Sequence, residues 1–560
     1  MPKLVECVPN FSEGRDKTII DAIAQMIETT DEVTLLDVDP GADTNRTVIT
    51  FIGSPAGVKE AAFKAIARAA ELIDMRTHHG AHPRIGATDV CPFVPVSGVT
   101  AEECIALANE VGERVANELA IPVYLYEKAA TSPQRSNLAD IRSGEYEGLA
   151  EKIKDENWRP DFGKAKFNAK SGATVIGVRE FLIAYNINLN TKDKKLANTI
   201  AATIRETGKV KRDEAGYILR DESGAPLRDP GRLKSCKAVG WYIDEYGQAQ
   251  ISMNLVDYKE TPVHIAFDTV CEEAAKLGLR VTGSELVGLI PLQAMLDAGD
   301  YYLRKQGKSP GVPQEELIDI AVKSLGLTDI NDFDPMKKII EYRVYETKGP
   351  LVKMDLRDFA NELSMDSPAP GGGSVSALAG ALSSALVSMV ANLTTGKSGY
   401  EQVKDVMIDT AVNAQLLKDD LLKLIDKDTN AFNALMEAMR LPKKTDPEIE
   451  NRQKAIEEAS KQATLVPLEV MKQSLTVLEL IKKIAATGNK NAISDAGVAA
   501  LMSLASIKGA SLNVKINLPS IEDESFKQII AIEMDMITQN AQAMYDEIMQ
   551  TVNTRMHPDE

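Results

Sequence analysis

Hydrophobic positions in the first part of the chain alternate between a period of two and the spacing of an amphipathic helix. Strands are predicted where apolar residues alternate or run together between turn residues, over residues 4–8, 33–38, 47–52 and 89–94. Helices are predicted over residues 18–27 and around residues 61–69. Another helix is expected from Thr100, an N-cap residue that has Glu103 three positions later. The resulting order is β-α-β-β-α-β.

The same order returns in the next part of the chain. It comprises a strand over 181–186, a helix over 191–204, a hairpin of 241–246 and 249–255 around Gly247, a helix from Thr261, and Gly288 to Pro291, which parallels Pro92 to Pro95. Two copies predict an α/β fold of two ferredoxin-like sandwich subdomains with mainly antiparallel sheets, over residues 1–180 and 181–330. A cleft between such copies is a usual place for a ligand.

From Met354 onward the pattern is entirely helical. Leu356, Phe359, Ala360 and Leu363 form a stripe at helical spacing, and similar stripes follow over residues 403–440, 448–486, 492–508 and 526–552. We therefore predict an all-α helical bundle domain over residues 354–560, after a linker at 331–353. Residues 374–393 are the most apolar, but their serines and few bulky side chains favour a buried bundle helix over a membrane span.

Composition narrows the classes of function. The 560 residues are enough for three or four domains, and 44% hydrophobic with 26% charged residues is typical of a soluble protein. A net charge of −18 excludes a general nucleic-acid binder, although it allows a local basic patch. Five scattered cysteines and a start without a basic and apolar leader predict a reduced, cytoplasmic protein without structural zinc. The charged stretch 208–236 is predicted to be a solvated loop.

Three of the five histidines, His78, His79 and His82, lie within five positions between a helix pattern and a strand pattern. Because an imidazole takes and gives a proton near neutral pH, this loop is a candidate for acid and base chemistry. Two alternatives remain. His78 and His82 have zinc-ligand spacing only in a continuous helix, which Gly80 and Pro83 disfavour, or the rings simply bond to backbone groups.

The helical part offers a second candidate site. Residues 370–374 place three glycines before a helix, where free backbone N–H groups bind an anion or a polar ring edge. The lysine of a nucleotide-binding loop is missing, and a tight interhelical turn is the alternative. Of two nearby aspartates, Asp428 falls on the apolar stripe of its helix and Asp426 on another face, so Asp428 is the better candidate for a functional carboxyl. Within the next helix, Pro467 frees the carbonyl of Ala463.

The motif T-H-H-G-A-H-P-R-I-G-A-T-D-V-C-P-F-V-P at residues 77–95, with L-V-E-C-V-P-N-F-S-E-G at 4–14, resembles the formiminotransferase signature. The segment S-P-A-P-G-G-G-S-V-S-A-L at 367–378 resembles the opening of a cyclodeaminase. Together, and in this order, they resemble the formimidoyltransferase-cyclodeaminase family over nearly the full length. The resemblance implies a bifunctional folate enzyme of histidine degradation. It would transfer a formimidoyl group between N-formimidoyl-L-glutamate and tetrahydrofolate, then form 5,10-methenyltetrahydrofolate and ammonia.

The resemblance also implies partners and roles for individual residues. Tetrahydrofolate, polyglutamylated, is the expected co-substrate, no metal is expected, and family members are homo-oligomers. His82, in the H-P-R tripeptide, would carry the proton in the transfer, and Asp428 matches the catalytic aspartate of the family. The residues expected to line the folate are Gly163, Lys164, Ala165, Lys166, Phe167 and Gly172 in the first half and Gly371, Gly372, Gly373 and Ser374 in the second.

Five further residues are weaker candidates. Asp39, at the end of a predicted strand, either fixes the tautomer of His82 or caps the turn at Pro40. Asn10, Asn45 and Arg84 would bind substrate carboxylates or the pterin, although arginines on loops are mostly solvated. Asp495 either belongs to the second pocket or, with Ser494, caps a helix.

Two rival functions stay open. In one, a single half is catalytically active and the other half is only a folate-binding or assembly module. In the other, the protein is a structural oligomer, and its glycine turn serves only to pack two helices together. The position of Asp428 on an apolar stripe argues against this second alternative.

Overall fold

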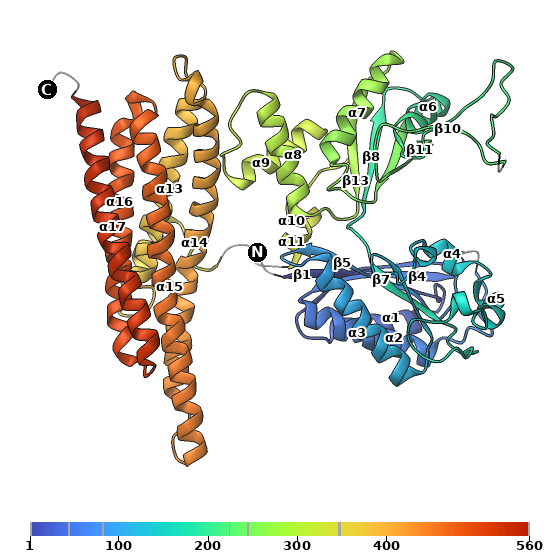
Figure 1. Ribbon diagram of the computed structural model, residues 1–560, viewed down its shortest axis with the longest axis horizontal. Coiled ribbons are helices and arrows are strands. Elements are labelled where there is room, and N and C mark those ends of the chain that lie inside the picture. Colours follow the sequence, from blue (N-terminus) through green and yellow to red (C-terminus); the bar gives the residue numbers. More distant parts are fainter. Residues whose placement is uncertain are drawn as a thin grey trace. The chain divides into compact units, whose positions relative to one another are not determined.

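The computed structural model describes residues 3–42, 45–80, 83–222, 224–243, 246–344 and 349–557. The chain divides into two compact units, one of residues 1–294 with 326–345 and the other of residues 295–325 with 346–560. The first holds the α/β part and the second the helical part, as the fold-class prediction has it (Figure 1). The finer domain boundaries given above stay predictions.

The first sheet of the α/β unit has seven strands. Their order is β1-β4-β2-β5-β7-β6, and β3 extends it by pairing with β4. All pairs among β1 to β5 are antiparallel, whereas β7 joins both β5 and β6 in parallel. The strands are β1 (Leu4–Cys7), β2 (Asn10–Phe11), β3 (Val33–Gly41), β4 (Arg46–Gly53), β5 (Thr88–Ser97), β6 (Val123–Glu127) and β7 (Thr174–Val178).

Three helices cover one face of this sheet: α1 (Lys17–Glu28), α2 (Pro55–Leu72) and α3 (Ala101–Leu119) (Figure 1). Each begins at a side-chain cap, and Thr100 and Glu103 form the predicted capping box of α3. Alternate strand residues such as Phe51 and Phe93 point into the core beneath the helices. Shorter helices lie elsewhere in this unit: α4 (Leu138–Arg142), α5 (Glu145–Lys152), α10 (Pro335–Lys338) and α11 (Ile340–Val344).

The second sheet has four antiparallel strands in the order β11-β12-β8-β13. The first sheet repeats this order in β3-β4-β1-β5, so the predicted duplication of a ferredoxin-like unit is confirmed. The elements are β8 (Ile183–Leu189), α6 (Lys194–Ile204), β11 (Cys236–Ile243), β12 (Gln248–Leu255), α7 (Val263–Lys276) and β13 (Val281–Val287). β11 begins five residues earlier than predicted, because its buried residues Cys236, Ala238 and Gly240 are small and give a weak alternation of apolar and polar positions.

Residues 208–236 form an arm that extends from the second sheet (Figure 1), with short paired strands β9 (Lys209–Val210) and β10 (Arg228–Asp229). The described residues from 211 to 229 are exposed, as a solvated segment should be. The arm repeats every eight residues: Asp213 and Asp221 each accept a backbone N–H four residues on. The arm is therefore an ordered chain of turns.

The second unit is built from long helices packed side by side (Figure 1). Their bounds are α8 (Leu292–Lys305), which starts in the first unit, α9 (Gln314–Leu325), α12 (Leu356–Leu363), α13 (Gly372–Thr395), α14 (Lys404–Arg440), α15 (Asp446–Thr487), α16 (Ile493–Asn517) and α17 (Glu524–Met556). Short 3₁₀ turns lie at Pro133–Arg135, Glu156–Trp158, Glu401–Val403, Lys490–Ala492 and Leu518–Ser520.

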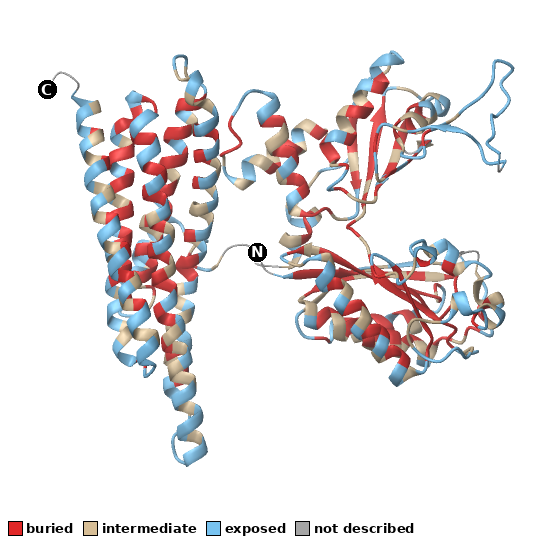
Figure 2. Ribbon diagram, in the orientation of Figure 1, coloured by how far each residue is buried: buried red, intermediate tan, exposed pale blue. Residues whose placement is uncertain are grey.

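Buried residues line the inward sides of the bundle helices (Figure 2). Gly372–Thr395 and Lys490–Ser520 are long and apolar enough to cross a membrane, but 61% and 56% of their apolar windows are buried against other helices. This is the pattern of core helices, as predicted for residues 374–393. The carbonyl of Ala463, which Pro467 frees within α15, accepts a hydrogen bond from Asn517 Nδ2 at 2.8 Å.

Candidate active sites

His78, in the histidine loop, holds the loop in place. Its ring is buried, with Nε2 2.8 Å from the carbonyl oxygen of Asn45 and Nδ1 3.3 Å from Arg84 Nε. Since the carbonyl can only accept and the guanidinium can only donate, these partners assign the proton to Nε2. Burial, reinforced by the charge of Arg84, lowers the pKa of His78, so the ring is neutral at pH 7.

Asn45 connects this loop to the β3–β4 hairpin. Its side chain donates to the carbonyl of His79 at 3.0 Å and accepts the N–H of Gly14, also at 3.0 Å. Its backbone has a positive φ of 48°, a conformation that asparagine tolerates better than most residues. With its oxygen, nitrogen and carbonyl all engaged, Asn45 serves here as a framework residue, and its predicted contact with substrate stays a prediction.

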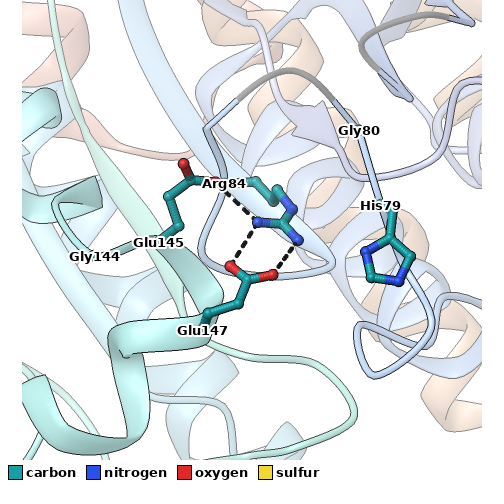
Figure 3. A pocket seen from close by; sticks show the side chains of 6 residues that line it. All are labelled: His79, Gly80, Arg84, Gly144, Glu145 and Glu147. Carbon is teal, nitrogen blue, oxygen red and sulfur yellow. Dashed lines mark hydrogen bonds and ion pairs between the residues drawn. The ribbon is translucent and has the colours of Figure 1, made fainter.

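Arg84 lies at the wall of a cavity of about 500 Å³ that His79, Gly80, Gly144, Glu145 and Glu147 also line (Figure 3). Arg84 is 5% exposed, and its guanidinium donates to Glu145 at 2.9 Å and to Glu147 at 2.7 and 2.9 Å. A substrate carboxylate would have to displace one of these two glutamates to reach it. The sequence reading missed Glu145 and Glu147, because nothing in the local pattern brings residues 145–147 to residue 84.

The segment predicted to line the folate meets the histidine loop. Ala173 N–H donates to the Ile85 carbonyl at 3.0 Å, and Ala87 N–H donates to that of Ser171 at 2.9 Å. A Cβ on Gly172 would overlap the Ile85 carbonyl, so this approach requires glycine. The ring of Phe167 lies 5.5 Å from the ring of Tyr146, whose neighbours in sequence are Glu145 and Glu147. Residues 163–166 are exposed. Three segments far apart in sequence thus converge.

A buried ion pair anchors the start of the segment that is predicted to line the folate. Asp161 pairs with Arg135 at 2.7 Å, with side chains 7% and 9% exposed, and accepts the N–H of Leu125 at 2.8 Å. Arg135 also donates to the carbonyls of Asn157 and Arg159. Because both partners also bond to the backbone, the pair fixes where the chain turns toward Gly163.

His82 lies outside the described residues, so its predicted partnership with Asp39 stays a prediction. Asp39 is exposed on β3 opposite Val48, and Asn10 lies opposite Val48 on its other side. Facing residues of antiparallel strands share one side of a sheet, so Asp39 and Asn10 lie on the same side, away from α1 to α3. Asn10 donates to the Val8 carbonyl at 2.9 Å.

In the helical unit, the glycine turn and Asp428 meet. Ser374, fully buried in the first turn of α13, donates to the Ile425 carbonyl at 2.9 Å and lies 3.2 Å from Asp428 Oδ2. A Cβ on Gly373 would overlap the Asp428 carboxyl, so the carboxyl keeps this position only with glycine there. Burial raises the pKa of Asp428, against hydrogen bonds from the side chain and backbone of Ser374.

The sequence predicted that Asp428 would be the more buried of the two aspartates of α14, and this prediction is wrong. Asp426 is the more buried, at 8% exposed, whereas Asp428 is half-buried. The reason is that Asp426 accepts the N–H of Leu351 at 2.9 Å and of Val352 at 3.3 Å, which fastens the end of the linker to α14. Asp426 therefore has a structural partner, while Asp428 faces the glycine turn.

Asp495 does not join this cluster. α16 begins at Ile493 with Ala492 at the N-cap, so Ser494 and Asp495 lie within the first turn, and their alternative assignment as the helix cap is wrong. The residues of α16 that lie near the glycine turn are instead Asn513, which faces Gly372, and Gly509, which faces Ser376. Asp495 lies ~27 Å from Asn513 along α16, at about 1.5 Å per residue. Asn513 is a candidate that sequence reasoning missed.

No group of three His, Cys, Asp or Glu side chains within the described ranges is placed to hold a metal ion. The predicted absence of a metal stays a prediction.

Comparisons with known proteins agree with this division. A model of the formiminotransferase domain, N-terminal subdomain, matches residues 4–179, one of the formiminotransferase domain matches 184–345, and one of formiminotransferase-cyclodeaminase matches 355–536. The formimidoyltransferase-cyclodeaminase of Dictyostelium discoideum is 45% identical over 560 residues, covering 99% of this chain and 100% of that protein. The chain belongs to the formimidoyltransferase-cyclodeaminase family.

Two further relatives carry the name of a single activity. The glutamate formimidoyltransferase of Streptococcus pyogenes serotype M1 is 41% identical over 304 residues, covering 54% of this chain and 94% of that protein. The methenyltetrahydrofolate cyclohydrolase of Methylorubrum extorquens is 38% identical over 202 residues, covering 36% of this chain and 97% of that protein. The chain is thus similar both to full-length formimidoyltransferase-cyclodeaminases and to shorter proteins named for one activity.

Gly373→Ala is expected to damage the second site, because the new methyl group overlaps the Asp428 carboxyl. We expect ammonia release to fall about a hundredfold as the carboxyl moves from its position. Gly396→Ala, at the other end of α13, is the matched control, since its Cβ would meet no atom within 4 Å and its φ of −96° suits alanine. Initial rates of ammonia release measure both variants, and equal rates would contradict the expectation.

Proposed function

We propose that this chain is a bifunctional folate enzyme. The first unit transfers the formimidoyl group of N-formimidoyl-L-glutamate to tetrahydrofolate, and the second converts 5-formimidoyltetrahydrofolate to 5,10-methenyltetrahydrofolate with release of ammonia. The observation that carries the proposal is the carboxyl of Asp428 facing a glycine turn at a helix start, in a unit separate from the histidine loop. The relatives named for each activity add support.

In the transfer, N5 of tetrahydrofolate attacks the amidine carbon and the amine of glutamate leaves. N5 loses a proton and the leaving amine gains one, so a single base that returns its proton serves both steps. We assign this role to His82. The convergence of the histidine loop with residues 161–173 supports a folate beside it, because Gly172 and Ile85 are in direct contact.

In the second reaction, N10 attacks the formimidoyl carbon, and ammonia departs after it accepts a proton. The proton that N10 loses can be carried to the leaving nitrogen by a carboxyl whose pKa is raised toward neutrality. Burial raises the pKa of Asp428 above its ordinary value, and Ser374 orients the carboxyl from the start of α13. The free N–H groups of that helix turn would bind a polar edge of the pterin.

Two separate assays on the purified protein test the proposal. With N-formimidoyl-L-glutamate and tetrahydrofolate, we expect glutamate release, and with 5-formimidoyltetrahydrofolate alone, we expect ammonia and the absorbance of the methenyl product. Activity in only one assay would favour the alternative in which the other half is a folate-binding or assembly module. Activity in neither would overturn the proposal.

We further propose that the protein acts in histidine degradation and uses a polyglutamylated folate. We also propose that it is cytoplasmic and forms a homo-oligomer. The five cysteines as free thiols support a reducing compartment. Exposed apolar side chains at seven-residue spacing on α13, namely Val375, Leu382 and Met389, support association of like chains. A molar mass of one chain in light scattering would overturn the oligomer.

A further inference from the structure

The hydroxyl of Ser374 has three hydrogen-bond partners and a single proton to give. Its Oγ lies 2.9 Å from the carbonyl oxygen of Ile425, 3.2 Å from Asp428 Oδ2 and 3.2 Å from Thr429 Oγ1. A serine hydroxyl donates one hydrogen bond, so at any moment it serves either the Ile425 carbonyl or the Asp428 carboxyl. Ser374 is 0% exposed, and bulk water therefore does not compete for this proton.

The partner that the hydroxyl takes depends on whether Asp428 carries a proton. A carboxylate accepts a hydrogen bond more strongly than a peptide carbonyl does, because it bears a full negative charge. The hydroxyl therefore donates to Asp428 when this carboxyl is ionised, and to the Ile425 carbonyl when the carboxyl is protonated. The Ile425 carbonyl loses little by the exchange, since it also accepts the N–H of Thr429 within α14.

Resting on the ammonia-releasing reaction proposed above, we propose that Ser374 is a positioning residue whose hydroxyl alternates between Asp428 and the Ile425 carbonyl during each turnover. The hydroxyl donates to Asp428 while this carboxylate waits for the proton of N10. It donates to Ile425 while Asp428 holds that proton, and it returns to Asp428 when the proton has passed to the leaving nitrogen. One proton moves from N10 to the ammonia, and Ser374 keeps its own. Because the Ser374 side chain has no exposed surface, it acts on the substrate only through Asp428.

Thr429 supports the exchange from the same helix as Asp428. Its half-buried hydroxyl lies 3.2 Å from Ser374 Oγ, and it can donate to this oxygen while Ser374 donates to Asp428. Hydrogen bonds in such a chain strengthen one another, because a hydroxyl that accepts a hydrogen bond becomes a better donor. Thr429 therefore favours the ionised form of Asp428 as well, but less than Ser374 does.

Charged side chains do not take over this role. Burial has the largest effect on the pKa of Asp428 and raises it, and the effects that lower it are hydrogen bonds from the side chain and backbone of Ser374. α13 carries no charged residue, and on α14 Asp426 bonds to the linker while Lys427 is exposed. The charged residues of the linker, α15 and α16 at this level are Lys353, Lys461, Glu469, Lys508 and Lys515, and none of them shifts the pKa of Asp428.

The first test measures ammonia release from 5-formimidoyltetrahydrofolate against pH in Ser374→Ala. Without its donor the ionised carboxyl is less stable, so the acidic limb of kcat should move about one pH unit higher. KM should stay within about twofold, because the hydroxyl does not touch the substrate. Ser384→Ala is the matched control, since this serine is also 0% exposed on α13 and donates to a carbonyl of α14, that of Ala414, at 2.7 Å. It should leave the acidic limb in place.

A second measurement does not depend on activity. The Ser374 hydroxyl lowers the pKa of Asp428 in the folded protein, so its contribution to stability is present when Asp428 is ionised and is lost as the pH falls. The melting temperature of Ser374→Ala should therefore fall further below that of the wild-type protein at about pH 8 than at about pH 5.5. Ser384→Ala should lower the melting temperature equally at both values.

The two measurements separate this role from the proposed function. If Ser374→Ala left the acidic limb in place, or shifted both measurements no more than Ser384→Ala does, the role of Ser374 would be overturned while ammonia release stood. If the wild-type protein released no ammonia, the proposed function would fail, and the melting temperatures alone would decide whether Ser374 stabilises the ionised carboxyl. Should Ser374→Ala fail to fold, Thr429→Val keeps the shape of its side chain and should shift both measurements in the same direction by a smaller amount.

Discussion

Asp428→Asn is expected to lower the release of ammonia about a thousandfold while formimidoyl transfer continues at the wild-type rate. A general acid and base contributes two to four orders of magnitude, and an amide cannot carry the proton. The substitution keeps the shape of the side chain and an oxygen for Ser374, which lies 3.2 Å from Oδ2. The two assays described above, run on one preparation, measure the effect.

The same variant should not unfold the protein. The folded state raises the pKa of Asp428 by burial, so the folded state binds its proton more tightly than the unfolded chain does. That term destabilises the folded protein once the pH exceeds the pKa of about 4 in the unfolded chain, and it persists at pH 7. Asparagine removes it, so the melting temperature at pH 7 should stay equal or rise.

Asp426→Ala is the contrasting variant two residues away. It leaves the N–H groups of Leu351 and Val352 without their acceptor, which destabilises by about 1–3 kcal/mol for each buried group. We expect a lower melting temperature with ammonia release largely kept in the folded fraction. If Asp426→Ala abolished ammonia release and Asp428→Asn did not, the proton carrier would be Asp426 and our assignment of Asp428 would be wrong.

Periodicity predicted the fold because each repeated unit buries one face of its sheet. The strands over 33–38 and 47–52 carry that face at every second residue, and the order of β3, β4, β1 and β5 follows from the β-α-β-β-α-β connection. The same reasoning ranked the burial of Asp426 and Asp428 incorrectly. Helical stripes describe one helix, whereas Asp426 is covered by the linker segment that contains Leu351.

The first site shows a similar limit. The histidine loop was identified from its residue types, whereas the folate segment was identified only through the family resemblance. The structure brings the two together through Ile85 and Ala173. The partners of Arg84 could not be predicted, since Glu145 and Glu147 reach it only through the tertiary fold.

We expect a different effect on activity and stability when each of the three histidines of the loop is changed to alanine. His82→Ala is expected to lower formimidoyl transfer about a thousandfold, because the proton carrier is lost, while ammonia release from 5-formimidoyltetrahydrofolate continues. His78→Ala should instead lower the melting temperature, since the Asn45 carbonyl and Arg84 Nε lose their buried partner. His79, which lines the cavity beside Arg84, should change transfer less than His82 does.

This series separates a chemical role from a framework role within five residues of one loop. A neutral ring bonded through both nitrogens, as His78 is, cannot exchange a proton without breaking one of those bonds. Transfer rates, ammonia release and melting temperature of the three variants are therefore measured together. If His82→Ala retained transfer, or if His78→Ala lost transfer at an unchanged melting temperature, the proton carrier would be another residue of the loop.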